Sequence, residues 1–238
     1  MLLDSNETKE KILAEFLPIC AFDGWTQDAL LKAISQCKIE EKFAGLIFEN
    51  GCLDLAEFYV EFQNKKAAQK LAEITDFHSK KIREKIRLAL YARFEVEKNN
   101  QLALQRLRNF YLDPKNFTSL EIGAKPAIQS LQACYKISDF IWKEINDQST
   151  DFNFYTKRLT LAKIILRSFA VFVKDESQDF VTTKNFVDSQ IESVMKFEKR
   201  KQQVKKVFNE VFLNQDGAPK SAKEFVKNLP FFRLIKFK

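Results

Sequence analysis

Glycine and proline are scarce in this sequence, with five of each among 238 residues. Sheet proteins connect their strands through many turns, and turns depend on these two residue types. The scarcity therefore argues against a sheet protein and in favour of long helices. Hydrophobic residues make up 45% of the chain, which is enough for a sizeable core and excludes disorder throughout.

Residues that commonly carry catalysis are also few. The single histidine, His78, has no local motif that would support a catalytic triad. One histidine cannot supply the two Glu-x-x-His motifs of a carboxylate-bridged di-iron bundle. The five glycines form neither a Walker pattern nor a GxGxxG loop. We therefore favour a binding protein over an enzyme and expect no catalytic residue, metal ion or cofactor, although a small helical enzyme with an unrecognised site is an alternative.

The cysteines are Cys20, Cys37, Cys52 and Cys134. They form no CxxC pair and no metal-ligand spacing, and we interpret them as reduced thiols of a reducing compartment. The N-terminal MLLDSNETKE is polar and acidic where a secretory signal needs a basic region and an apolar run. The most apolar stretch, 159–173, is interrupted by Lys163, Arg167 and Ser168, so no transmembrane span is expected.

Positive charge is concentrated at the C-terminal end. From Lys196 to Lys238 there are twelve Lys or Arg and four Asp or Glu, whereas the preceding residues are almost neutral as a group. A localised basic segment suggests an anionic partner, either a membrane or a nucleic acid. A solvated helix end would give the same composition.

The segment 217–238, GAPKSAKEFVKNLPFFRLIKFK, combines this charge with apolar side chains. It suits the interface of an anionic bilayer, and we expect a short amphipathic helix near 221–236 that Pro230 kinks or stops. Packing of its rings onto the body is the alternative. The predicted membrane-contact residues are Phe225, Leu229, Phe232, Lys227 and Arg233.

Helical periodicity is nearly continuous, so we predict an all-α fold. The expected helices lie near 7–17, 26–36, 40–48, 52–73, 79–97, 99–111, 123–145, 151–174 and 180–212. NQDGAP at 214–219 is the clearest linker. The predicted organisation is a degenerate helix-turn-helix region at 1–50, a larger helical domain at 51–213, and a linker with a basic amphipathic tail at 214–238.

The segment 22–48 places a helix at 26–36, a turn around 37–39 and a second helix at 40–48. This resembles the helix-turn-helix of TetR-type regulators, which precedes a large helical ligand domain. A helix that reads DNA should carry Arg, Lys, Asn or Gln, but residues 38–57 hold two Lys against five acidic residues. Repulsion from phosphate disfavours nucleic acid as a partner. A transcription regulator that senses an apolar ligand is nevertheless the alternative function.

The segment QSTDFNFYTKR, residues 148–158, begins a helix that Thr150 or Asp151 can cap. On a helical wheel of 152–174, polar side chains form one narrow stripe and apolar ones fill most of the other side. The helix is therefore wrapped by protein, either as plain core or as the wall of an apolar cavity.

Arg158 lies in the middle of the apolar face of that helix, where an unpaired guanidinium would be costly. Either an acid such as Asp139 or Asp147 pairs with it, or the first helical turn projects past the core and leaves Phe154 and Tyr155 partly exposed. An exposed aromatic patch beside Arg and Lys has the composition of a protein–protein hot spot.

Five motifs occur along the chain in the order FDGW at 22–25, KIREKIRLAL at 81–90, DFIW at 139–142, DQSTDFNFYTKR at 147–158 and VMKFEK at 194–199. Through them the chain resembles the ubiquinone-biosynthesis accessory family of alphaproteobacteria and mitochondria. The resemblance implies a TetR-like fold that binds isoprenoid lipid and assists the di-iron hydroxylase that acts on demethoxyubiquinone. It also implies membrane contact through a C-terminal amphipathic helix.

The family's surface Trp–Tyr pair, implicated in contact with the hydroxylase, falls on Phe154 and Tyr155. The family usually has Trp where this chain has Phe154, and Gly where it has Asn146. Phenylalanine lacks the indole N–H and some ring area, which bears on the strength of that contact. The predicted partner-binding patch is Phe154, Tyr155, Trp142 and Arg158, and the predicted lipid-binding residues are Leu161, Ile165, Phe169, Phe172, Leu131 and Tyr135.

The resemblance predicts an accessory protein, not itself an enzyme, that presents a polyprenylated quinone precursor to its hydroxylase. The expected partners are demethoxyubiquinone hydroxylase, the quinone lipid as bound ligand, and an anionic membrane surface. A homodimer is a further expectation, because TetR-like folds often dimerise. The expected location is the cytoplasm of a bacterium, peripherally on the inner membrane.

Overall fold

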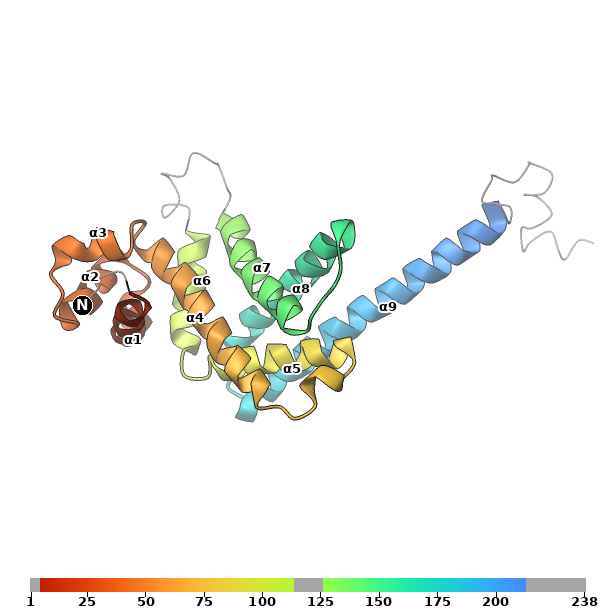
Figure 1. Ribbon diagram of the computed structural model, residues 1–238, viewed down its shortest axis with the longest axis horizontal. Helices are drawn as coiled ribbons and strands as arrows, with labels where there is room; N and C mark the ends of the chain where they lie inside the picture. Colours follow the sequence, from red (N-terminus) through yellow and green to blue (C-terminus); the bar gives the residue numbers. More distant parts are fainter. Residues whose placement is uncertain (1–4, 114–125, 213–238) are drawn as a thin grey trace, which may run out of the picture. The chain divides into compact units, whose positions relative to one another are not determined.

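The computed structural model describes residues 5–113 and 126–212, and all regular structure within these ranges is helical (Figure 1). The predicted all-α class is confirmed. The helices are α1 Asn6–Asp23, α2 Gln27–Gln36, α3 Ala44–Ile47, α4 Cys52–Ala72, α5 Ile82–Glu95, α6 Gln101–Leu112, α7 Pro126–Glu144, α8 Asp151–Phe172 and α9 Val181–Phe212. Short 3-10 turns occur at Glu41–Phe43, Phe77–Ser79 and Gln178–Phe180.

Two of the expected helices have different limits. The sequence predicts an end near residue 17 for the first helix, but α1 continues through Pro18 to Asp23. A proline inside a helix removes one backbone hydrogen bond. Phe16 and Cys20 are buried on either side of Pro18, and their packing offsets that loss.

The expected helix at 40–48 is interrupted. A 3-10 turn at Glu41–Phe43 leads into α3, which is a single α-helical turn. Gly45 lies inside that turn, and glycine weakens a helix because it loses more backbone freedom than other residues on folding. The TetR-like architecture and the domain limits at 50 and 213 stay predictions.

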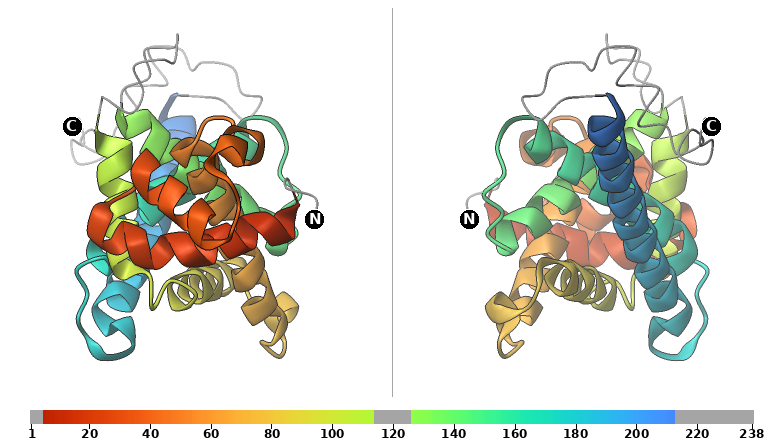
Figure 2. Two further views of the ribbon diagram at one scale, coloured as in Figure 1. Left: turned by 90° about the vertical axis from the view of Figure 1, so that its left-hand side faces the viewer. Right: turned by 90° about the vertical axis from the view of Figure 1, so that its right-hand side faces the viewer.

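The N-terminal helices pack on the helical body through Trp25. Helix α1 contacts α2, α4 and α6 (Figure 2). The Trp25 ring lies 4.8 Å from that of Phe16 and 5.7 Å from that of Tyr59, both edge to face. Its indole N–H donates to the Ala103 carbonyl at 2.9 Å. One buried side chain therefore connects α1, α4 and α6.

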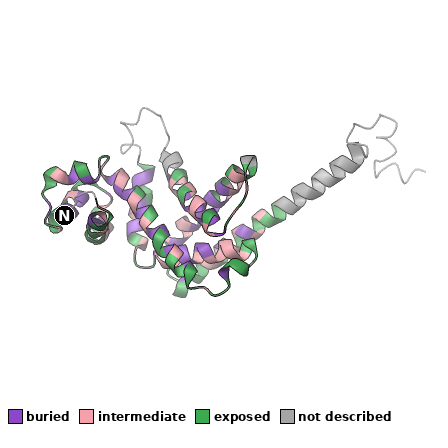
Figure 3. Ribbon diagram, in the orientation of Figure 1, coloured by how far each residue is buried: buried purple, intermediate pink, exposed green. Residues whose placement is uncertain are grey.

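The chain divides into two compact units, 1–188 and 189–238. In the first unit α8 packs along α7, and α7 also contacts α4, α5 and α6. Buried residues, purple in Figure 3, recur along these helices and form the core. Among the residues that the structure describes, no helix combines the length and apolarity needed to cross a membrane.

Candidate functional site

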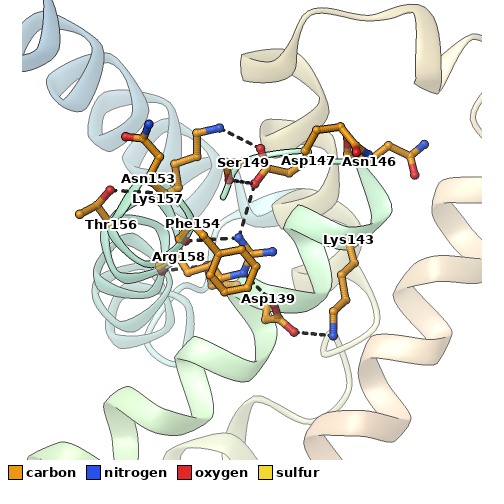
Figure 4. Close-up of polar contacts among 12 residues, drawn as sticks. Asp139, Lys143, Asn146, Asp147, Ser149, Asn153, Phe154, Thr156, Lys157 and Arg158 are labelled. Carbon is orange, nitrogen blue, oxygen red and sulfur yellow. Dashed lines mark hydrogen bonds and ion pairs between the residues drawn. The ribbon is translucent and has the colours of Figure 1, made fainter. Parts of the chain in front are cut away.

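Arg158 lies at the centre of a charged cluster formed by α7, α8 and the loop between them (Figure 4). Its side chain is only 3% exposed. Nε donates to Asp139 Oδ1 at 2.7 Å, and one terminal nitrogen donates to Asp147 Oδ2 at 3.4 Å. The same nitrogen donates to the Phe154 carbonyl at 3.3 Å. Both acids that the sequence offered as partners therefore pair with the buried guanidinium.

The Asp147 carboxylate accepts hydrogen bonds from several side chains. The donors are the Lys157 ammonium at 2.8 Å, the Ser149 hydroxyl and Arg158. Desolvation of the Asp147 carboxyl favours its neutral form and is the largest single influence, but the hydrogen bonds from Lys157 and Ser149 and the charge of Lys157 together outweigh it. The pKa of Asp147 therefore lies below its usual value.

Asp139 has a similar environment on α7. One carboxylate oxygen accepts from Arg158, and the other accepts from the Lys143 ammonium at 2.7 Å. Desolvation again opposes ionisation most strongly, and the hydrogen bonds from Arg158 and Lys143 outweigh it, so the pKa of Asp139 is lowered. Two ionised carboxylates thus face the Arg158 guanidinium.

The loop after α7 brings Asp147 to this position. Asn146 has a φ of 57°, in the left-handed region that favours Gly or Asn. The Asp147 amide then donates to the Trp142 carbonyl at 3.0 Å and closes the turn. Thr150 is the N-cap residue of α8 with extended backbone, but its side chain makes no capping hydrogen bond. The side chain of Asp151 lies outside the described part of the chain.

Phe154 and Tyr155 continue the site towards the solvent. The Arg158 guanidinium carbon lies 3.4 Å from the centroid of the half-buried Phe154 ring. The Tyr155 ring, 5.1 Å from that of Phe154, meets it edge to face. Tyr155 is 60% exposed, and Leu159 on the next turn is 42% exposed. We call Phe154, Tyr155 and Leu159 the aromatic surface; Leu159 was not among the predicted patch residues.

The other two predicted patch residues are not exposed. Arg158 and Trp142 are both buried. The Lys157 ammonium lies 5.1 Å from the centroid of the Trp142 ring, and the Trp142 indole N–H has no hydrogen-bond partner among the described residues. A protein that docks here would therefore meet Phe154, Tyr155 and Leu159 first.

An apolar cavity of about 70 Å³ lies among α4, α6, α7 and α8. Its apolar wall is Val60, Leu104, Leu107, Ala133, Ile137, Leu166, Phe169 and Val173. The wall is completed by Tyr59, Arg93, Arg108, Tyr111, Ser130 and Cys134. The buried Ser130 hydroxyl has no hydrogen-bond partner in the described part of the chain. The cavity is thus mainly apolar with a few polar groups in its wall.

A second cavity of about 240 Å³ shares Val60, Tyr111 and Ala133 with the first. Glu57 and Lys136, also in its wall, form an ion pair of 2.9 Å. Burial, followed by the charge of Glu57, raises the pKa of Tyr111 above its usual value. The two cavities are neighbours, because the same three side chains belong to both walls.

The predicted lipid-binding residues divide between these cavities and the core. Phe169 lines the smaller cavity and Tyr135 the larger one. Leu161, Ile165 and Phe172 are buried core residues, and Leu131 is half-buried; none of these four lines either cavity. Helix α8 is therefore core along much of its length and contributes a cavity wall near its C-terminal end.

A buried polar cluster beside the smaller cavity was not predicted. The Arg93 guanidinium pairs with Glu97, and its Nε donates to the Asn64 side chain at 3.2 Å. Tyr59 and Gln63 also donate to the Glu97 carboxylate. Burial, together with the charge of Glu97, raises the pKa of Tyr59 well above its usual value. The four-residue spacing of Arg93 and Glu97 was visible in the sequence, but the same spacing is common in exposed pairs.

The histidine and the cysteines lie apart from the charged cluster around Arg158. His78 is exposed and contacts the Phe77 ring. Burial raises the pKa of the Cys20 and Cys52 thiols to about 12, which disfavours reactive thiolates. Within residues 5–113 and 126–212 no three His, Cys, Asp or Glu side chains are grouped to hold a metal ion. The predicted membrane-contact residues Phe225, Leu229, Phe232, Lys227 and Arg233 lie outside the described residues.

The described helices surround an apolar cavity and carry the aromatic surface beside the charged cluster. The chain is therefore an all-α protein with an apolar site among its helices. The COQ9 family model matches residues 127–198, a range that includes Arg158, both of its acids and the aromatic surface. The matched range is thus the part of the chain that builds the charged cluster.

Several curated proteins are similar over most of the chain. The probable ubiquinone biosynthesis protein coq9, mitochondrial, of Dictyostelium discoideum is 26% identical over 195 residues, which is 80% of this chain and 60% of that protein. The ubiquinone biosynthesis protein COQ9, mitochondrial, of Bos taurus is 25% identical, covering 84% of this chain and 61% of its own length. The Homo sapiens protein of the same name is 24% identical, with coverages of 84% and 61%.

The chain spans about 60% of the length of these relatives. Their names refer to a biosynthetic pathway and to no catalysed reaction. The predicted resemblance to the ubiquinone-biosynthesis accessory family is confirmed by these matches.

Proposed function

We propose that this chain is a lipid-binding accessory protein of ubiquinone biosynthesis. It takes up a polyprenylated quinone precursor and presents it to demethoxyubiquinone hydroxylase at a membrane surface. The observation that carries the proposal is the apolar cavity among α4, α6, α7 and α8. The names of the relatives supply the pathway.

The dimensions of the cavities limit what part of the ligand they accept. Their volumes are about 70 and 240 Å³, whereas ligand pockets usually measure about 300–1,000 Å³. Movement of the shared side chains of Val60 or Tyr111 would join the two volumes and reach the lower end of that range. The quinone ring or one end of its chain would then fit, and the rest of the chain would extend beyond these cavities.

The aromatic surface is the proposed contact for the hydroxylase. Tyr155 and Leu159 are large side chains that stay exposed beside the half-buried Phe154. Contiguous exposed aromatic and aliphatic side chains near Arg and Lys are typical of protein–protein hot spots. In this proposal the iron chemistry belongs to the partner, and this chain contributes binding and presentation.

The basic segment 214–238 is the proposed membrane contact, and this part of the proposal rests on the sequence. Each Lys or Arg near an anionic surface contributes about 1 kcal/mol. Removal of residues 215–238 should abolish sedimentation with anionic vesicles while neutral vesicles serve as the control. Unchanged sedimentation would move the membrane contact to another part of the protein.

A transcription regulator is less well supported. The segment that would read DNA contains only a 3-10 turn and one α-helical turn, and Glu40 and Glu41 are exposed on it. Exposed carboxylates repel phosphate. This local geometry favours the lipid-binding function over DNA recognition.

Mass spectrometry of lipid extracted from protein purified without detergent tests the proposed ligand. We expect an isoprenoid lipid in the parent protein and much less in Ala133→Trp, because the new ring fills wall space common to both cavities. Ala72→Trp, at an exposed position at the end of α4, is the matched control. A parent protein that carries no isoprenoid lipid would contradict the proposal.

A further inference from the structure

We infer that Arg158 is a positioning residue for the aromatic surface: Asp139 and Asp147 orient its guanidinium, and the guanidinium in turn orients the Phe154 ring. This inference rests on the proposed partner-binding role of that surface. It assigns the buried charged cluster a function at the surface above it.

The stacking of Arg158 on Phe154 is close and centred. The guanidinium carbon is 3.4 Å from the ring centroid, which is about the contact distance of two stacked planar groups. The carbon therefore lies directly over the middle of the ring. A planar guanidinium can make this contact and donate in its own plane at the same time, whereas a lysine ammonium cannot.

The orientation of the guanidinium is set from outside α8. Asp139 belongs to α7 and Asp147 to the following loop, and they accept from different nitrogens of Arg158. The Ser138 hydroxyl on α7 also donates to the Arg158 carbonyl at 2.8 Å. These contacts fix the guanidinium plane relative to α7, and the ring that stacks on it is fixed as well.

The charges around the cluster support this arrangement. Lys157 donates to Asp147 and Lys143 donates to Asp139, so each carboxylate is shared between Arg158 and a lysine. Each carboxylate therefore has a lysine ammonium as a second cationic partner besides the buried guanidinium. Arg158 itself is nearly inaccessible, so its direct contact with a docking protein would be small.

A fixed ring matters for docking because immobilising a side chain on binding costs free energy. The Phe154 ring has no polar atom that could fix it by hydrogen bonding, and its other aromatic contact is the edge-to-face one with Tyr155. Releasing the ring should therefore weaken partner binding by about two- to tenfold without removing any atom of the aromatic surface.

The experiment places a spectroscopic probe at position 154. Phe154→Trp introduces an indole that time-resolved fluorescence anisotropy and acrylamide quenching can follow. The existing Trp25 and Trp142 are both buried, and their contribution is subtracted with the protein that retains Phe154. We expect a restrained indole in Phe154→Trp and a clearly more mobile, more easily quenched one after the further change Arg158→Lys.

Two further variants keep the test decisive. The triple variant with Asp139→Asn, Asp147→Asn and Arg158→Gln removes the guanidinium and both carboxylates at once, so it leaves no buried charge without a partner. It serves as the test if Arg158→Lys alone folds poorly. Lys163→Gln, on an exposed position of α8, is the matched control and should leave the indole restrained.

Hydroxylase affinity is measured on the parent protein, on Arg158→Lys and on the triple variant, all of which retain Phe154. The expected result is a mobile ring and two- to tenfold weaker binding in Arg158→Lys and in the triple variant. An indole that stays restrained in both, or a freed indole with unchanged affinity, would overturn the inference. If the parent protein does not bind the hydroxylase, the proposed function fails, while the mobility of the indole still decides whether Arg158 positions residue 154.

Discussion

Arg93 and Arg158 are the buried arginines of the described part of the chain, and they pair with acids in different parts of the molecule. Arg93 pairs with Glu97, four residues further along the chain, and with Asn64 in the core beside the cavity. Arg158 pairs with acids 19 and 11 residues away and stacks on a ring at the surface. The Arg93 guanidinium carbon lies 5.7 Å from the centroid of the Phe169 ring, which lines the smaller cavity. The two ion pairs therefore differ in whether the ring beside the guanidinium belongs to a cavity wall or to the aromatic surface.

The largest effect is expected at the core arginine. Glu97→Ala leaves the Arg93 guanidinium buried without its carboxylate, and breaking such a pair costs about 3–5 kcal/mol. Urea denaturation followed by circular dichroism measures the change in unfolding free energy. Replacing both Arg93 and Glu97 by methionine should recover much of the loss, because no charge stays buried. A loss below about 1 kcal/mol for Glu97→Ala would show that water reaches this cluster.

The next effect concerns binding and leaves the fold nearly unchanged. Phe154→Ala combined with Tyr155→Ala should weaken hydroxylase binding by about 2–4 kcal/mol, as for hot-spot residues. The melting temperature should change little because Tyr155 is largely exposed. Isothermal titration calorimetry and thermal unfolding give the two values. A large fall in melting temperature would identify both rings as core residues instead.

Asp147→Asn should have a smaller effect on stability than Glu97→Ala. Arg158 keeps its shorter bond to Asp139, and Lys157 can reach solvent because it is half-buried. We expect a loss of about 1–2 kcal/mol in unfolding free energy, as for a hydrogen bond to a charged group. Asp179→Asn, at an exposed position, is the control. A loss equal to that of Glu97→Ala would remove the distinction between the two clusters.

The smallest expected effect is a pH dependence of the loss of unfolding free energy in Asp147→Asn. The folded pKa of Asp147 is lowered, so its contribution to stability is complete above the unfolded pKa of about 3.9 and disappears as the pH falls through the folded value. The difference in unfolding free energy between the parent protein and Asp147→Asn should therefore shrink between pH 6 and about pH 3. A difference that is constant over this range would show that Asp147 titrates alike in both states.

The sequence predicted most of the helices because helical periodicity is nearly continuous. For Arg158 it left two alternatives, pairing with an acid such as Asp139 or Asp147 or a first helical turn that projects past the core, and the structure shows the pairing together with an exposed Tyr155. The prediction from sequence failed at Pro18, where burial of the flanking side chains outweighs the lost backbone bond. It also failed near Gly45, where a predicted helix is only one α-helical turn.

The cavities could not be located from sequence. Periodicity identifies which side chains face inwards, and Leu161, Ile165 and Phe172 are indeed buried. Whether a buried side chain lines a void depends on how residues of four helices fit together, and only Phe169 and Tyr135 of the predicted set do so. Burial of the Arg93–Glu97 pair was missed for a related reason: its spacing is the same as that of an exposed pair.

The wall shared by the two cavities has an evolutionary consequence. Val60, Tyr111 and Ala133 belong to both walls, so a change of size at one of them alters the internal volume in a large step. A smaller residue in place of Tyr111 merges two compartments, whereas a larger residue in place of Ala133 divides them further. Under the proposed function, single substitutions inside the body would change the length of ligand that related chains hold, without any change in the aromatic surface.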